Sequence, residues 1–378
     1  MYTTASRRFF SFCIGIPVLV VAGCAGIGAL LNLYLASPPQ IFAGGDAERL
    51  VYAVYQSGPD DMHVPEGGTP TLKDVYTLDL ERMEAQRIAS DVAFALIDPT
   101  AWRPQIAADG RYIAWVDRQD ADVKLLDMDS GALSDWPVLG NGHGDGVFLM
   151  DGRLVVNRDV DGDHELVIVD IDSGNQTVVE DSWLYAGFAL SGDDLVLRNS
   201  RDTDVEILGL ELSANIEHVD LATGQREWIA RNLRIPGDGG ALYAADGRAV
   251  WSEYKESTFD LRIRSYDLES GELETLVENA DFSTGEARLC GAGGDQLLLQ
   301  MSSGDPLFGE TVWLETLGFD GQRVTIAELG NMAAPRWSYL PTPRMIDHLV
   351  VWTDPHSGVL QMYDSKTRQT ESFNSVGE

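Results

Sequence analysis

A short turn motif recurs along most of this chain, at intervals of roughly 43 to 50 residues. It reads Asp-Met-Asp-Ser-Gly at 127–131 and Asp-Ile-Asp-Ser-Gly at 170–174, with looser copies at 220–224 and 267–271. A degenerate copy spans 317–321. The first aspartate of the motif recurs at Asp79, Asp127, Asp170, Asp220, Asp267 and Asp364. Self-similarity at this period is typical of solenoids and propellers.

The segments inside each repeat decide between those two architectures. They are short, rich in β-branched residues and separated by Gly, Asp, Asn and Ser, with no helical periodicity. A second turn lies about 18 residues before each motif, clearest at Asp109-Gly110, Asp151-Gly152 and Asp246-Gly247, and an apolar run follows it. Four short strands per repeat predict an all-β fold with seven propeller blades, and six or eight blades are the less favoured alternatives.

One copy carries a family resemblance. Residues 104–115 read Pro-Gln-Ile-Ala-Ala-Asp-Gly-Arg-Tyr-Ile-Ala-Trp. This segment resembles the Pro-x-x-Ser-Pro-Asp-Gly-x-x-Ile-Ala-Phe repeat of TolB-like propellers, a repeat class akin to WD-type blades. The other copies match in part, and together they cover nearly everything after residue 42. The resemblance implies a blade and no chemistry. TolB itself is expected to carry an α/β domain before its propeller, and only some 40 residues precede the first repeat here, so its partner-binding role is not carried over.

The N-terminal segment predicts export. Arg7-Arg8 precedes a run from Phe9 to Ala36 without a charged residue, which is long enough to span a bilayer as an anchor helix. The flanking arginines favour the cytoplasmic side, with the propeller extracytoplasmic. Two alternatives remain: a lipoprotein signal, because Val-Ala-Gly-Cys at 21–24 resembles a lipobox with Cys24 as the lipidated residue, and a cleaved secretory signal. All three place the domain in the cell envelope.

We therefore expect three parts: a signal anchor or lipoprotein signal over 1–36, a linker over 37–47 that begins with Ser-Pro-Pro, and a propeller over 48–378.

The charge balance limits the partners. The chain has 60 acidic against 27 basic residues, a formal net charge of −33. Such a surface repels phosphate backbones, which argues against nucleic-acid binding. It favours cations and basic partners.

A candidate binding face follows from propeller symmetry, because residues that end the second strand of each repeat fall on one face. This face would combine aromatic side chains with carboxylates, which suits a sugar, a basic peptide or a cation. In the alternative interpretation the tryptophans pack between blades and the acids are solvated turn residues. The candidates are Trp115, Asp117, Asn157, Arg198, Trp251, Glu253, Trp352 and Asp354.

A calcium site is the one cofactor hypothesis. Asp159, Asp161 and Asp163 lie in an acidic stretch with a glycine, and Ca²⁺ prefers oxygen ligands. The spacing is not that of an EF-hand loop, and the alternative is a solvated Asp-Gly hairpin between two strands.

No nucleophile elbow or zinc-spaced histidine pair occurs in the sequence. Whether the protein is an enzyme stays open, and a non-enzyme is favoured. The sequence predicts a membrane-tethered, extracytoplasmic β-propeller that acts as a non-catalytic binding or scaffold module for a protein, glycan or envelope component. The alternative is a carbohydrate-active hydrolase or lyase that uses carboxylates on one propeller face.

Overall fold

The computed structural model describes most of the chain after residue 39, which forms one compact unit over Gln40–Glu378. The described ranges are 40–46, 48–55, 72–93, 106–117, 122–137, 143–150, 152–160, 163–180, 188–199, 211–236, 242–255, 261–278, 287–305, 309–332, 343–354 and 359–373. The predicted anchor segment, Cys24 and Asp161 lie outside them. A search of these ranges for a long apolar helix able to cross a membrane finds none.

The described residues are all-β, as the repeats predict. In chain order the strands are β1 (Gln40–Gly45), β2 (Arg49–Tyr55), β3 (Leu72–Asp79), β4 (Glu84–Ala93), β5 (Ile106–Ala108), β6 (Tyr112–Val116), β7 (Val123–Asp127), β8 (Leu133–Trp136), β9 (His143–Met150), β10 (Arg153–Val160), β11 (Asp163–Asp170), β12 (Gln176–Val179), β13 (Phe188–Ser191), β14 (Asp194–Asn199), β15 (Glu211–Asp220), β16 (Arg226–Pro236), β17 (Leu242–Ala245), β18 (Arg248–Tyr254), β19 (Leu261–Asp267), β20 (Leu273–Val277), β21 (Ala287–Gly293), β22 (Gln296–Asp305), β23 (Gly309–Gly318), β24 (Arg323–Met332), β25 (Arg344–Ile346), β26 (Leu349–Thr353), β27 (Leu360–Asp364) and β28 (Gln369–Phe373).

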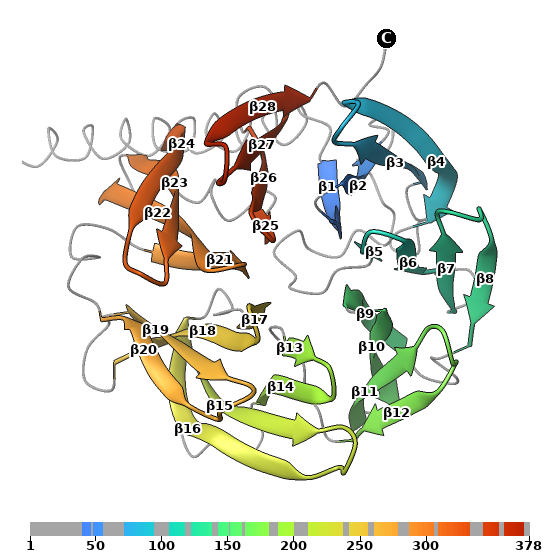
Figure 1. The fold of residues 1–378 in the computed structure, drawn as a ribbon, viewed down its shortest axis with the longest axis horizontal. Coiled ribbons are helices and arrows are strands. Elements are labelled where there is room, and N and C mark those ends of the chain that lie inside the picture. Colours follow the sequence, from blue (N-terminus) through green and yellow to red (C-terminus); the bar gives the residue numbers. More distant parts are fainter. Residues whose placement is uncertain are drawn as a thin grey trace, which may run out of the picture. The chain divides into compact units, whose positions relative to one another are not determined.

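Consecutive strands pair antiparallel in sets of four, from β1–β4 to β25–β28. The first strand of each set lies near the centre and the fourth lies outermost, so the sheets stand around a central axis as in a propeller (Figure 1). Neighbouring sets are also joined by backbone pairing at two places. Strand β1 pairs with β5 at Gly44 and Ala108, and β16 pairs with β18 at Arg234 and Tyr254. Strand β1 lies within residues 37–47, which the sequence predicted to be a linker. The strand was not predicted because this segment lacks the turn motif that marked the other strands.

The repeated motif forms the turn between the third and fourth strands of a set. In the second set, Asp127 Oδ1 accepts hydrogen bonds from the backbone N–H groups of Asp129 at 2.9 Å and Ser130 at 3.1 Å. Gly131 follows with φ +69°, a conformation that glycine adopts without steric cost. The aspartate thus satisfies turn amides and the glycine reverses the chain. This confirms the turn predicted at each motif.

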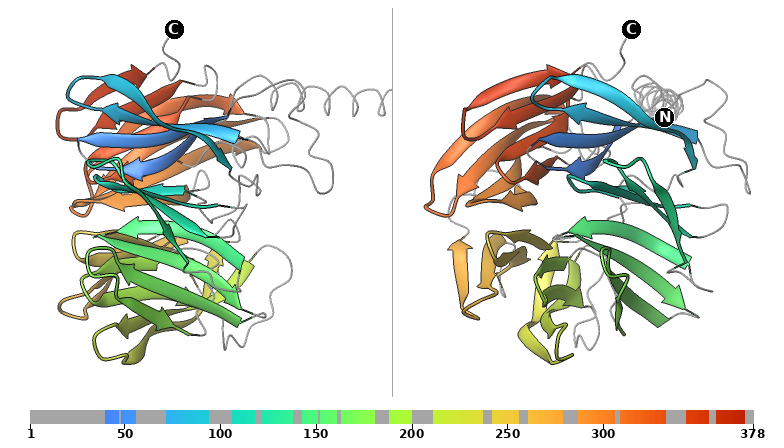
Figure 2. Two further views of the ribbon diagram at one scale, coloured as in Figure 1. Left: turned by 90° about the vertical axis from the view of Figure 1, so that its right-hand side faces the viewer. Right: turned by 45° about the vertical axis from the view of Figure 1, so that its right-hand side comes forward.

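The turns between first and second strands lie at the same end of the blades. Asp109 Oδ1 accepts hydrogen bonds from the N–H groups of Arg111 and Tyr112 at 2.9 and 2.6 Å. We call the side that carries both kinds of turn the turn face; it lies at the left of the left-hand view in Figure 2.

The core is divided among neighbouring sets. Seven hydrophobic clusters occur among the described residues, and each combines side chains of two adjacent sets. One of them packs Leu50 and Tyr52 of β2 against Val351 of β26 and Leu360 of β27. The first and last sets therefore meet through side chains. Within the described ranges, no strand of one set pairs with a strand of the other.

Candidate functional site

The eight predicted site residues lie within the second strands of their sets or just after the ends opposite the turn face. The side chains of Trp115, Trp251 and Trp352 are buried, with exposed fractions of 6%, 0% and 6%, and each belongs to a hydrophobic cluster. The tryptophans therefore pack between neighbouring sets, as the alternative interpretation predicts. Asp117 and Asp354 follow β6 and β26, and both have polar contacts.

Glu253 on β18 is the centre of a buried charge cluster. Its side chain is 1% exposed. It accepts hydrogen bonds from Trp251 Nε1 at 2.9 Å, from Arg262 Nε at 2.5 Å and from Arg264 Nη1 at 3.4 Å. A buried carboxylate is stabilised by such paired cations, and leaving either charge alone would be costly. In this arrangement Glu253 serves as the counter-ion of two arginines on β19.

A comparable pair lies in the preceding set. Glu217 on β15 is buried, and both its oxygens accept hydrogen bonds from Arg226, from Nε at 2.8 Å and from Nη2 at 2.7 Å. This fork geometry gives one of the stronger charge-assisted contacts in proteins. Asn199 Nδ2 adds a hydrogen bond at 3.3 Å to Oε2.

Equivalent positions of four successive second strands are buried and polar. These strands are β10, β14, β18 and β22. The residue at the same register position of β6 is Val116, which is apolar. The four residues are Asn157, Arg198, Ser252 and Gln300, and we call them the polar layer. Asn157 Oδ1 has no hydrogen-bond partner among the described residues. Sequence analysis found two of these four, Asn157 and Arg198. Ser252 and Gln300 carry no signal apart from their register.

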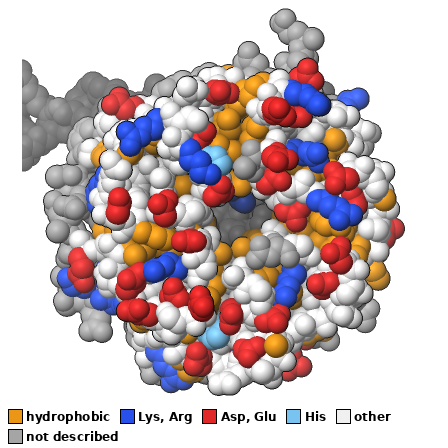
Figure 3. All heavy atoms as spheres, viewed as in Figure 1, with side chains coloured by type: hydrophobic (Ala, Val, Ile, Leu, Met, Phe, Trp, Pro, Cys, Tyr) orange, Lys and Arg blue, Asp and Glu red, His pale blue; other side chains and the backbone are white. Residues whose placement is uncertain are grey.

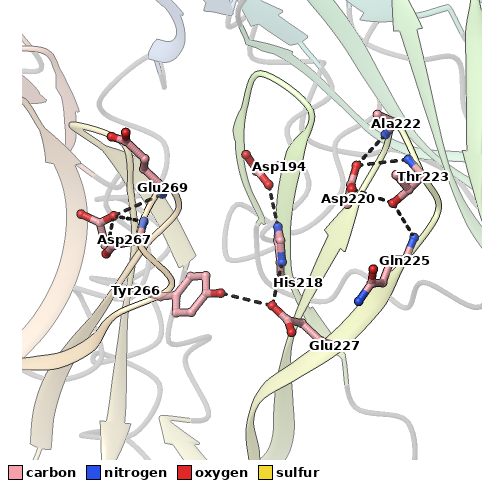
Figure 4. A network of polar contacts seen from close by, with 11 residues as sticks. Asp194, His218, Asp220, Ala222, Thr223, Gln225, Glu227, Tyr266, Asp267 and Glu269 are labelled. Atoms are coloured by element: carbon pink, nitrogen blue, oxygen red, sulfur yellow. Dashed lines mark hydrogen bonds and ion pairs between the residues drawn. The ribbon is translucent and has the colours of Figure 1, made fainter.

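A second cluster, which sequence analysis missed, surrounds His218 of β15 (Figure 4). His218 Nε2 lies 2.8 Å from Asp194 Oδ1, and Nδ1 lies 3.2 Å from Glu227 Oε1. The hydroxyl of Tyr266, on β19 of the next set, donates to the same Glu227 oxygen at 3.3 Å. An imidazolium donates from both nitrogens, so the protonated ring satisfies both carboxylates.

The electrostatics of this cluster come from burial and charge together. Burial raises the pKa of the Tyr266 phenol, and the neighbouring Glu227 carboxylate raises it further. The hydroxyl of Thr223 lowers the pKa of Asp220, and the nearby His218 adds to the effect. The link between these residues is visible only in the structure, where the β14–β15 pairing places Asp194 opposite Asp220, two residues after His218.

The proposed calcium ligands are only partly described. Strand β10 ends at Val160 and β11 begins at Asp163, so Asp159 and Asp163 lie on paired strands, while Asp161 lies outside the described residues. Among the side chains that the structure describes, no group of three His, Cys, Asp or Glu is arranged to hold a metal ion.

The turn face carries many acidic side chains around a central hollow, with basic side chains between them (Figure 3). Several of these acids are paired. Arg111 contacts Asp127 at 2.8 Å, and Arg153 contacts Asp193 of the next set at 2.9 Å. Asp347 contacts both His348 and Lys366, and the hydrogen bond from His348 is the main cause that lowers the pKa of this aspartate.

Comparisons with known proteins identify the fold. No protein-family model and no curated protein sequence matches the chain. Among solved structures, the β-propeller domain of the Trilobed protease from Pyrococcus furiosus, described as having an open velcro topology, matches with a TM-score of 0.60 at 12% identity. The match covers 90% of this chain and 99% of that domain.

Two further structures are similar. The acylaminoacyl peptidase of Pyrococcus horikoshii matches with a TM-score of 0.58 at 12% identity over 90% of this chain, which spans only 53% of that enzyme. An oligogalacturonate lyase from Vibrio parahaemolyticus matches with a TM-score of 0.51 at 13% identity, over 86% of this chain and 97% of the lyase. At such identities the likeness shows a β-propeller fold and no activity.

Proposed function

We propose that this protein is a non-catalytic binding or scaffold module whose turn face docks a basic protein partner. One observation carries this proposal: carboxylates of that face are bonded to their own turn amides or to neighbouring cations. Asp170, for example, accepts the N–H of Ser173 at 2.8 Å. Groups held this way form a rigid acidic surface, and a rigid charged surface suits recognition and fast association.

Exposed acids occupy the same place in three of the turns. These acids lie two residues after the first aspartate of the turn motif, which caps the turn amides. They are Asp129, Asp172 and Glu269, and all three are exposed. They project from a backbone fixed by the turn hydrogen bonds. A partner with a spaced set of Lys or Arg side chains would complement them.

The wider setting is part of the proposal. The ring has seven blades, an assignment supported by the seven clusters that each combine two adjacent sets. The uncharged run over residues 9–36 tethers it to a membrane, with the propeller extracytoplasmic and nucleic acid excluded as a partner by charge. The hydrolase or lyase alternative receives no support from Glu253, since its carboxylate is buried against two arginines.

The test is capture from a host envelope extract with the purified full chain in mild detergent. The variant D129K/D172K/E269K reverses three charges on the turn face. The control D135K/E328K/E371K makes the same charge change at exposed positions on the outermost strands, away from the turns. We expect the wild type and the control to retain the same protein, and the turn-face variant to lose it.

Equal capture by the turn-face variant and the control would overturn the docking surface. A folded bait that captures nothing reproducibly, and that turns over a carbohydrate in a substrate screen, would replace the binding proposal with the enzyme alternative.

A further inference from the structure

The histidines of the turn face share one arrangement. The structure describes two histidine side chains, those of His218 and His348. His218 lies two residues before the turn motif that begins at Asp220, and His348 lies in the turn between β25 and β26. Histidine side chains are visible among the acids of this face (Figure 3). Each of the two rings contacts two carboxylates, one through each nitrogen.

The His218 ring connects two strands of its own set and lies beside the next set (Figure 4). Its nitrogens contact Asp194 of β14 and Glu227 of β16, at 2.8 and 3.2 Å. The ring of Tyr266 lies 6.0 Å away between centroids. A protonated imidazole donates to both carboxylates. A neutral one donates to a single carboxylate and directs a lone pair at the other, so loss of the proton weakens the contact.

The charged groups around His218 are acidic apart from the ring itself. Asp194 and Glu227 have no arginine or lysine partner among the described side chains, and Arg226, beside Glu227 in the chain, is bound to Glu217. Asp220 lies two residues further along β15. The phenol of Tyr266 also lies within the electrostatic influence of Asp267. The proton on the ring is therefore the local counter-charge of this cluster.

His348 repeats this arrangement in the last set. Its Nδ1 lies 2.5 Å from Asp347 Oδ2, and its Nε2 lies 3.9 Å from Asp364 Oδ1. Lys366 Nζ is the other cation of the group, 3.5 Å from the same Asp347 oxygen. The hydrogen bond from His348 is the main cause that lowers the pKa of Asp347. Loss of the ring proton leaves two carboxylates with one lysine.

Both rings can exchange protons with water and can influence a docked molecule. The side chain of His218 is 14% exposed and that of His348 is 18% exposed. Histidine changes charge between about pH 5 and pH 8. Charges at a surface interact over about 8–10 Å at physiological ionic strength, so two added positive charges weaken the local attraction for a cation.

From this geometry we infer that His218 and His348 form a proton switch that regulates docking at the turn face. The protonated rings hold their carboxylates and reduce the negative charge of the face, so a basic partner binds less tightly. Loss of these protons as the pH rises from about 5 to 8 strengthens docking. The inference rests on the proposed docking function, but the histidine contacts exist without a partner and are tested without one.

The first test is thermal denaturation of the full chain in mild detergent at about pH 5.5 and pH 8. Glutamine stays neutral and donates to one carboxylate, so H218Q/H348Q imitates the neutral rings. The variant should lose more stability at the lower pH, with a difference between the two losses of about 2 °C or more in melting temperature. Arg82→Gln removes a charge of the turn face that does not titrate in this range, and should have the same effect at both pH values.

The second test measures docking with labelled octa-arginine, acetylated and amidated at its ends, because guanidinium groups stay charged throughout this range. At constant ionic strength, fluorescence anisotropy should show about three- to tenfold tighter binding at the higher pH for the wild type. The ratio should be closer to one for H218Q/H348Q. Arg82→Gln should change both affinities by the same factor and keep the wild-type ratio.

His218→Gln and His348→Gln are also measured singly, so a folding defect in the double variant does not hide the result. Equal losses of melting temperature at the two pH values in all three variants would overturn the switch, and so would a wild-type affinity ratio in H218Q/H348Q. Equal binding of octa-arginine by the wild type and D129K/D172K/E269K would overturn the docking surface and, with it, the regulation. The stability comparison decides on the histidine contacts by itself, so the two failures are distinguishable.

Discussion

At the turn face, aspartates cap backbone amides two or three residues away, whereas at the opposite ends of the second strands carboxylates are buried against arginines of neighbouring strands. Asp267 bonds to the N–H of Ser270 at 2.8 Å within one turn. Glu253 instead contacts Arg262 and Arg264, nine and eleven residues away and across a strand pair. The first kind of contact recurs because every turn requires it. The second occurs where a particular blade buries a charge.

The largest effect is expected at the buried carboxylate of Glu253. Glu253→Leu leaves Arg262 and Arg264 without their counter-ion and Trp251 Nε1 without an acceptor, and breaking a buried pair typically costs about 3–5 kcal/mol. We expect a clearly lower denaturant midpoint in urea unfolding. The control Glu269→Leu, on an exposed turn, should change stability by less than about 0.5 kcal/mol. Equal losses of stability in the two variants would mean that the buried carboxylate contributes no more to stability than the exposed one.

The next largest effect is expected in the turns of the turn face. Gly174 has φ +72° with open space where a Cβ would lie, so strain and not a clash opposes a side chain. Gly174→Ala should cost about 1–2 kcal/mol in unfolding free energy. Gly174→Asn should cost less, because asparagine enters the left-handed region more readily. Thermal denaturation of the two variants provides the comparison, and a harmless alanine would show that the turn tolerates another conformation.

A pH dependence follows from the capping aspartates. The hydroxyl and N–H of Ser173 lower the pKa of Asp170, and the hydroxyl of Thr223 lowers that of Asp220. Because the folded pKa lies below the unfolded value of about 3.9, the stabilisation is fully present above that value. It is lost as the pH falls through the lowered pKa.

D170N/D220N should therefore flatten the fall of the melting temperature between about pH 4 and pH 2, since asparagine accepts the same hydrogen bonds without titrating. Glu81→Gln, at an exposed turn position, is the control and should leave the slope unchanged. An unaltered slope in the double variant would assign acid sensitivity to other carboxylates.

The smallest effect concerns a contact that joins two sets near the turn face. Tyr266→Phe removes the hydroxyl that donates to Glu227 and should cost about 0.5–1 kcal/mol. A double-mutant cycle with Glu227→Gln measures the coupling. A loss above about 2 kcal/mol would mean that the His218 cluster holds the two sets together as strongly as a buried ion pair.

The fold was predictable because its signals are local. The Asp–Gly turn at 109–110 and the motif at 127–131 each define a hairpin from a few adjacent residues. Strand β1 was missed because Gln40–Gly45 carries no such turn. At the candidate site, the sequence located the ends of the second strands. It left open whether Trp251 lies on a surface, because burial depends on the neighbouring blade.

By itself, the sequence determined the repeat, the all-β class and the positions of the capping turns, because each rests on contacts within a few residues. Only the tertiary structure decided that Glu253 is a buried counter-ion and that Tyr266 of the next set meets Glu227. The first fact depends on which side chains the folded sets bury, and the second depends on which sets become neighbours around the ring. No local pattern encodes them, since burial depends on the surrounding side chains and Tyr266 lies 39 residues after Glu227 in the chain.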